Sequence, residues 1–134
     1  MSELTLAFAT NDDKILVPGH AGSADHYLIY RIDEDGTTLI ERRVNPKVQE
    51  NESLNHGDPI KATSIKNLLA GVDGIIGRRF GPNITRMVKH FICVITRVES
   101  IEESMQLIQR HREVLLEAKD ARPDKPIILT REEP

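Results

Sequence analysis

One histidine, His20, stands in a loop of small residues that includes two glycines and runs from Val17 to Tyr27. Neutral imidazole is the commonest nitrogen ligand for iron, zinc and copper in proteins. Three roles are open to His20: a solvent-facing or hydrogen-bonded side chain, a contact to a metal or cofactor, or a catalytic acid or base. His26, at the far end of the loop, either caps the same pocket or has a structural or surface role.

A second loop, Gly77–Asn83, places two arginines, Arg78 and Arg79, before Gly81. It joins the end of a predicted strand to the start of a predicted helix, where backbone N–H groups and the helix dipole favour an anion. The spacing matches neither a P-loop nor a dinucleotide fingerprint, which argues against a nucleotide site. The loop is predicted either to face an anion or only to form a tight strand-to-helix turn.

Other residues with reactive side chains have simpler explanations. His56, in the polar stretch 45–57, is a candidate third donor, whereas Asp58 is better explained as the N-cap of a helix that begins at Pro59. Cys93 lies within the apolar run 91–96 and is predicted to be a core residue. No catalytic constellation emerges from these residues, so we expect a protein that is not an enzyme.

The overall charge sets limits on the partners. Eighteen Lys and Arg face 21 Asp and Glu, giving a net charge of -3, which argues against a nucleic-acid-binding protein. The distribution is uneven, because no acidic residue occurs between Asp73 and Glu99. A local anion site therefore remains open. The basic residues of this segment are Arg78, Arg79, Arg86, Lys89 and Arg97.

The composition, with 39% hydrophobic and 29% charged residues in 134, is that of a soluble globular domain. A single cysteine excludes an intramolecular disulfide framework and a thiolate zinc site. No apolar run approaches the roughly 20 residues that cross a bilayer, and the N-terminus lacks the basic region of a secretion signal. We expect a cytoplasmic protein with no membrane partner.

The hydrophobic pattern predicts an α/β domain. Asp35–Gly36 is a hairpin turn signal between the second and third strands, and Ser100 with Glu103 forms a capping box for the last helix. Alternation of strands and helices after residue 58 predicts parallel strands with right-handed crossovers. The predicted strands are 4–9, 26–32, 38–44, 72–77 and 91–96, and the predicted helices are 59–70, 82–90 and 100–116.

These elements suit a mixed five-stranded sheet in the order 3-2-1-4-5, with strand 2 antiparallel to strand 1. Connections leave strands 1 and 4 in different directions, and ligands bind at such a switch point beyond the carboxyl ends of the strands. The loops there are 10–25 and 78–83. We expect one domain over residues 1–121 and a tail, 122–134, that adds an edge strand or contacts a partner, including a second copy of the chain.

Four segments in this order resemble the dinitrogenase iron-molybdenum cofactor biosynthesis family. They are Ala7–Thr10, the His20–Asp25 loop with the Tyr27–Tyr30 strand that follows it, Gly71–Ile76 and Gly81–Asn83, and the resemblance covers residues 4–108. The usual loop of the family reads His-Phe-Gly, where this chain has His20-Ala21-Gly22. The resemblance implies a ribonuclease H-like, three-layer fold, in agreement with the strand order above.

The resemblance also implies a function: holding the iron-molybdenum cofactor, or an iron-sulfur cluster precursor of it, for delivery to nitrogenase through its assembly proteins. His20 is then the candidate metal ligand. The two arginines are not part of the family pattern; from their charge and position, they and the turn that follows them are predicted to face the negative charge of the cluster. The expected cofactor-binding residues are His20, Gly22, Arg78, Arg79, Gly81 and Asn83.

Two other functions stay open. A ribonuclease H-like fold can carry a metal-dependent nuclease, which needs carboxylates that converge on two divalent cations. Asp12 and Asp13 follow strand 1, whereas Asp73 begins strand 4 at the opposite end of the sheet, so these carboxylates are not expected to converge. The third possibility, suggested by Ala21, is a regulatory or interaction protein that has lost cofactor binding.

Overall fold

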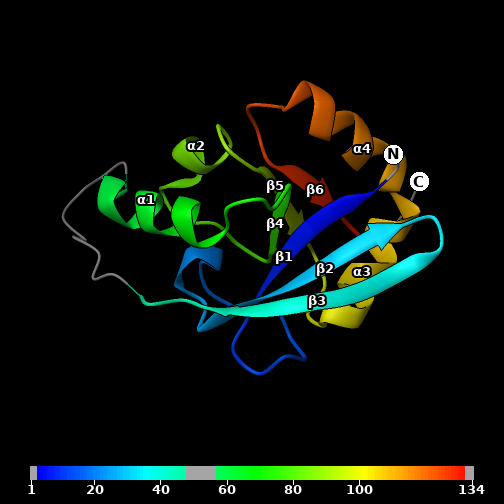
Figure 1. Ribbon diagram of the computed structural model, residues 1–134, viewed down its shortest axis with the longest axis horizontal. Helices are drawn as coiled ribbons and strands as arrows, with labels where there is room; N and C mark the ends of the chain where they lie inside the picture. The colour runs from blue at the N-terminus through cyan, green and yellow to red at the C-terminus, as the bar shows by residue number, and fades with distance from the viewer. Residues whose placement is uncertain (1–2, 48–56, 132–134) are drawn as a thin grey trace.

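The computed structural model describes residues 3–47 and 57–131, and its centre is a sheet of six strands in the order β3-β2-β1-β4-β5-β6 (Figure 1). β2 is antiparallel to both β1 and β3, while β4, β5 and β6 run parallel to β1. The predicted order of the first five strands is confirmed. The strands are β1 (Leu4–Thr10), β2 (His26–Asp33), β3 (Gly36–Val44), β4 (Gly74–Gly77), β5 (Ile92–Thr96) and β6 (Ile127–Leu129).

The sixth strand corrects the prediction of five. Ile127–Leu129 lies in the tail and pairs in parallel with β5, in the register Ile128 opposite Ile95. Its Leu129 is buried against the core. The tail therefore supplies an edge strand, one of the two roles expected for it. The proposed third donor, His56, lies outside the described residues, as does most of the polar stretch 45–57.

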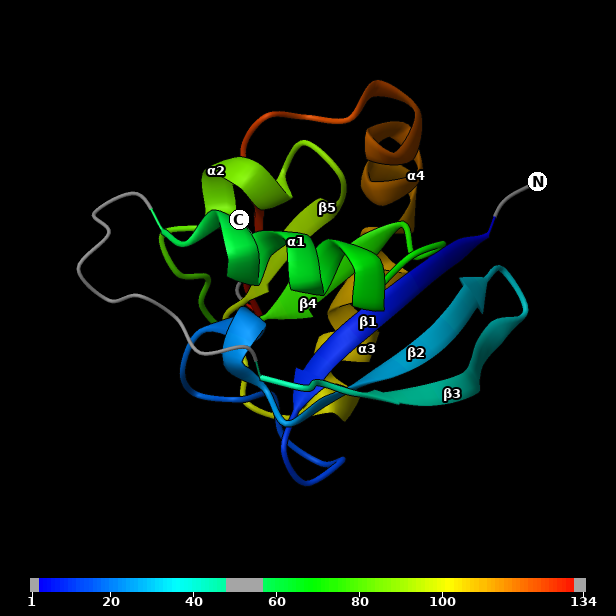
Figure 2. The same cartoon turned by 60° about the vertical axis from the view of Figure 1, so that its left-hand side comes forward.

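Helices cover both faces of the sheet, as Figure 2 shows with α1 in front and α3 behind. Asp58 caps α1 as predicted, because its carboxylate accepts a hydrogen bond from the backbone N–H of Ile60. Ser100 likewise accepts from the N–H of Glu103 at the start of α3. The helices are α1 (Pro59–Leu68), α2 (Ile84–Met87), α3 (Ile101–Arg110) and α4 (Arg112–Ala121), with a short 3-10 turn, η1 (Ala21–Ser23).

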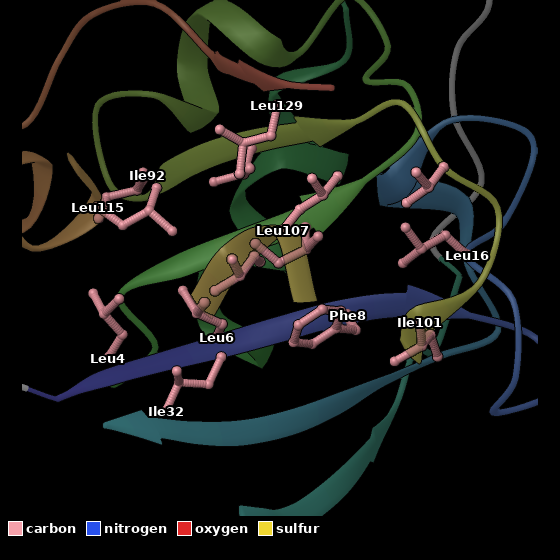
Figure 3. Close-up of a cluster of buried hydrophobic side chains, with 14 of the residues drawn as sticks. Leu4, Leu6, Phe8, Leu16, Ile32, Ile92, Ile101, Leu107, Leu115 and Leu129 are labelled. Carbon is pink, nitrogen blue, oxygen red and sulfur yellow. The ribbon is translucent and has the colours of Figure 1, made fainter. Parts of the chain in front are cut away.

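The last predicted helix is divided in the structure. His111 has φ -107° and ψ 23°, outside the helical region, and separates α3 from α4. In Figure 3, Phe8 and Ile101 lie at one end of a buried cluster, and Ile92 and Leu115 lie at the other. Ile101 of α3 and Leu115 of α4 thus both join the core on this face of the sheet.

β1 separates two hydrophobic cores because successive side chains point to opposite faces. Leu4, Leu6 and Phe8 join the cluster under α3 and α4, whereas Ala7 and Ala9 join the cluster under α1 and α2. The side chains of Ala7 and Ala9 are small, so the loop that carries His20 can pack close to this face of β1. No helix within the described ranges is long and apolar enough to cross a membrane.

Candidate functional site

The loops that follow β1 and β4 meet at one edge of the sheet. Ala7 is paired with Ile75 across these parallel neighbours, so both strands end at the same side. Beyond the strands, the backbone N–H of Ala21 donates to the carbonyl of Arg79 at 2.9 Å, and His20 forms a parallel bridge with Arg79. The adjacency expected for the two loops is confirmed.

His20 and Gly81 are in direct contact. A Cβ atom built on Gly81 would lie 2.7 Å from Nδ1 of His20 and 3.1 Å from its Cγ. The side chain of His20 is half-buried, and within residues 3–47 and 57–131 its imidazole has no hydrogen-bond partner. No hydrogen bond within these residues holds either ring nitrogen, and Nδ1 lies on the side of the ring that packs against Gly81.

A pocket lies between this contact and α1. Its cavity volume is about 30 Å³, room for one or two water molecules. Four of the predicted site residues come together in its wall, and they lie on segments more than 50 positions apart in the sequence. These four are His20, Gly22, Gly81 and Asn83.

The two predicted arginines do not line the pocket. Arg79 is exposed and Arg78 half-buried, and Arg79 contributes its backbone carbonyl to the loop contact. The cation in the pocket wall is Lys61 of α1, whose Nζ donates to the hydroxyl of Ser23 at 2.7 Å. Its Cε lies 3.5 Å from where a Cβ of Gly22 would stand.

Sequence reasoning missed Lys61. The available signal was its spacing, since Lys61 and the buried Ile65 are four residues apart on the same side of α1. That spacing shows that Lys61 shares the face turned to the protein. It does not show that this face meets the His20 loop, because the contact depends on how α1 lies over the sheet.

Asn83 uses both ends of its amide within the protein. Its Nδ2 donates to the carbonyl of Asp58 at 3.1 Å, and its Oδ1 accepts from Nη1 of Arg86 at 3.1 Å. Gly57, at φ +87°, lies so close that a Cβ there would overlap Asn83 Oδ1. Asn83 therefore joins the start of α1 to the start of α2 and shapes the pocket wall.

Tyr27 supports the His20 loop from below. It is fully buried, and its hydroxyl donates to the carbonyl of Ala21 at 2.7 Å. Burial raises the pKa of this phenol, so it stays a neutral donor. Tyr27 and Phe80, which lies on the opposite loop, both line the pocket.

His26 does not cap this pocket. It shares the face of β2 that carries Leu28 and Ile32, under α3 and α4, whereas the pocket lies on the Tyr27 face. Its ring is buried between the carboxylate of Asp13 and the guanidinium of Arg42. The structural role of His26 is confirmed.

Cys93 is the core residue expected from its apolar surroundings. Its side chain is buried within β5, and burial raises the pKa of the thiol to about 12. At neutral pH it is protonated, so it cannot act as a thiolate ligand. Of the residues that line the pocket, His20 is the one whose side chain commonly binds transition metals.

The carboxylates do not converge. Asp73 accepts a hydrogen bond from the N–H of Thr5 at 2.8 Å and pairs with Lys119 at 3.5 Å, near the start of β1. Asp12 and Asp13 follow the other end of that strand. In the described part of the chain no three His, Cys, Asp or Glu side chains are grouped to hold a metal ion. A two-metal nuclease site has no support.

The comparisons with known proteins agree with this architecture. A crystal structure of a putative dinitrogenase from Methanocaldococcus jannaschii superposes with a TM-score of 0.55 at 18% identity, over 84% of this chain and 93% of the other. An NMR structure of a putative dinitrogenase from Methanococcus jannaschii gives 0.54 at 18% identity, over 82% and 90%. At this identity the likeness shows the fold. No curated protein matches the sequence at a significant level.

The family comparison covers more than half of the chain and includes both loops of the site. The model described as "Dinitrogenase iron-molybdenum cofactor" matches residues 3–111, from β1 through the end of α3. His20 and Gly81 both fall within the match. The chain therefore belongs to the dinitrogenase iron-molybdenum cofactor family.

Proposed function

We propose that this protein is a non-enzymatic carrier of the iron-molybdenum cofactor or of an iron-sulfur cluster precursor, with His20 as the metal ligand. The observation that carries the proposal is the half-buried imidazole of His20, which lines a pocket against Gly81 and has no hydrogen-bond partner among the described residues. Membership of the dinitrogenase iron-molybdenum cofactor family supports this choice of cargo.

The donor set suits a preformed cluster better than a bare metal ion. Structural metal sites surround an ion with about four protein ligands, and the described residues hold no group of even three. A cluster already carries its own bridging ligands and needs only an open metal position. One imidazole ligand attaches such a cargo and also lets it leave, as delivery requires.

The shape of the site places the cargo at the mouth of the pocket. A cavity of about 30 Å³ cannot enclose a cluster. Gly22 and Gly81 expose backbone at the rim, where the absence of side chains permits close approach. The ammonium of Lys61 faces an anionic cargo at short range, while Arg78 and Arg79 add longer-range positive charge that salt screens.

The partners of a carrier are the proteins that load and unload it. In this proposal they are nitrogenase assembly proteins, and the protein acts in the cytoplasm. The helices on both faces of the mixed sheet are consistent with a ribonuclease H-like, three-layer fold.

Anaerobic loading of the purified protein tests the proposal. The isolated iron-molybdenum cofactor is added to the parent, to His20→Ala and to His111→Ala, and iron and molybdenum are measured after gel filtration. We expect parent and His111→Ala to retain both metals, and His20→Ala to bind at least about tenfold more weakly with an unchanged melting temperature. His111 is the matched control because it ends α3, on the other face of the sheet.

Two results count against the proposal. If His20→Ala retains the metals as well as the parent, His20 is not the ligand. If the parent retains neither the cofactor nor an iron-sulfur precursor, the protein is not a carrier.

A further inference from the structure

A second hollow lies between α1 and α2, beside the His20 pocket. Its volume is about 270 Å³, larger than that of the pocket. Ala62 and Met87 contribute to the walls of both and form the partition between them. We call this hollow the basic groove; its polar lining residues are Thr63, Lys66, Asn67, Arg86, Lys89 and His90.

The α1 side of the basic groove is one face of a helix. Two pairs of residues on α1 are four positions apart: Ala62 with Lys66, and Thr63 with Asn67. Side chains at this spacing lie on the same side of an α-helix. The same face begins at Pro59, the first residue of α1. A hydroxyl, an amide and an ammonium group are thus presented together toward α2.

The groove is uniformly basic in a protein of net charge -3. None of its described lining residues is acidic. Lys66 and Lys89 form no ion pair with any residue of 3–47 or 57–131. Arg86 is held by its hydrogen bond to Asn83. The sequence predicted a local anion site in the acid-free segment after Asp73. Arg86 and Lys89 of that segment line the groove together with Lys66 of α1.

The pKa of His90, which lines the groove, is lowered. Partial desolvation lowers the pKa of His90, and the charges of Lys66, Arg122 and Lys89 lower it further. These charges come from α1, from the residue after α4 and from the neighbouring position. A bound anion would oppose them and favour the protonated ring, adding a charged donor at the moment of binding.

We propose that the basic groove binds a phosphoryl group, a small oxyanion with two negative charges. Lys66 and Lys89 supply charge-assisted hydrogen bonds from two sides, and the hydroxyl of Thr63 and the amide of Asn67 supply neutral donors. The phosphoryl group belongs either to free phosphate or to a nucleoside monophosphate. The site is separate from the metal cargo and does not depend on His20.

Calorimetric titration of the full chain with inorganic phosphate at low ionic strength tests the proposal. We expect saturable binding to the parent, and at least about a tenfold weaker Kd for Lys66→Ala combined with Lys89→Ala, because both charge-assisted hydrogen bonds are lost. Lys14→Ala combined with Lys125→Ala is the matched control, because it removes the same charge from exposed positions outside the groove. We expect it to stay within about twofold of the parent.

Titrations with phosphate and with adenosine monophosphate identify the source of the phosphoryl group. Equal affinity for phosphate and adenosine monophosphate indicates free phosphate, and tighter binding of the monophosphate indicates a nucleotide; both keep the proposal. Absence of saturable binding at millimolar concentrations of either overturns it. An equal loss in the groove variant and the control variant also overturns it, because binding would then follow net charge alone.

The pH dependence adds an independent readout. Sulfate keeps its charge between about pH 5 and pH 8, so any change in its affinity arises from the protein. We expect sulfate to bind more tightly as the pH falls through the pKa of His90, and His90→Gln to flatten this dependence while keeping the fold. A profile identical in parent and variant contradicts the role of His90. Unchanged phosphate binding in His20→Ala separates this test from that of the carrier.

Discussion

The imidazole of His20 packs directly against the backbone of Gly81, so closely that a Cβ on the glycine would lie 2.7 Å from Nδ1 of the ring. The contact joins two loops, through residues that are 61 positions apart in the sequence. It exists because β1 and β4 are parallel neighbours whose carboxyl ends reach the same edge of the sheet. The orientation of the candidate ligand is thus set by the absence of a side chain at Gly81.

Gly81→Ala is expected to displace the ring of His20 and weaken cluster loading at least several-fold. The backbone of Gly81 has no positive φ that would strain alanine, so we expect the free energy of unfolding to change by less than about 1 kcal/mol. Anaerobic metal retention and urea denaturation measure the two effects. Gly19→Ala is the control, because a Cβ at Gly19 meets no atom within 4 Å.

Two outcomes of this experiment would contradict the expected role of the contact between His20 and Gly81. If Gly81→Ala loads as well as Gly19→Ala, the orientation of the His20 ring is not important for the cargo. If both variants lose loading equally, glycine flexibility in the loop matters more than the contact.

The sequence was informative about the site where hydrophobic pattern decides the structure. Short apolar runs place β1 and β4 in the sheet, and their adjacency follows from the βαβ rule, so the meeting of His20 with Gly81 could be predicted. The direction of an exposed side chain on a loop has no such constraint. Arg78 and Arg79 were therefore expected in a pocket that Lys61 lines instead.

The tail and the last helix show a similar limit. Ile127–Leu129 is a run of three apolar residues between prolines and polar residues, too short to distinguish an edge strand from a partner contact. The apolar stripe of the last helix continues past His111, so periodicity predicts one helix. The division at His111 depends on packing against both ends of the sheet, which a single segment does not encode.

A buried hydroxyl pair joins α3 to β5. Ser104 Oγ donates to Thr96 Oγ1 at 3.0 Å, and both side chains are fully buried. Thr96→Val leaves Ser104 without this acceptor, and we expect a loss of about 1–3 kcal/mol in the free energy of unfolding. In the double variant Thr96→Val with Ser104→Ala neither partner is left unpaired, so the loss should be smaller than the sum of the single losses. Additive losses in urea denaturation would contradict the coupling.

Cys93 gives a pH-dependent prediction. The pKa of its thiol is raised to about 12 in the folded protein and is about 8.5 in an unfolded chain. Because the folded pKa is the higher one, its stabilising contribution is complete below the unfolded pKa and is lost as the pH rises toward the folded pKa.

We therefore expect the parent to lose stability more steeply than Cys93→Ala above about pH 9, with an added slope of up to about 1.4 kcal/mol per pH unit. Urea denaturation of both proteins at several pH values measures the difference. At neutral pH we also expect iodoacetamide to react with Cys93 only after unfolding. Parallel stability profiles, or rapid alkylation of the native protein, would show that the thiol is not held in the core.

The hydroxyl of Tyr27 fixes the loop that carries His20, and its removal gives the last prediction. Tyr27→Phe keeps the buried ring but removes the donor to the Ala21 carbonyl, a bond of 2.7 Å in a fully buried position. We expect a loss of about 1–3 kcal/mol, because the carbonyl is left without this donor, and faster amide hydrogen exchange in η1. Tyr30→Phe is the matched control: within the described residues its hydroxyl has no hydrogen-bond partner, and its ring packs edge-on against Phe8. If the two variants unfold at the same urea concentration, the other hydrogen bonds and packing contacts of the loop hold it, and the position of His20 does not depend on Tyr27.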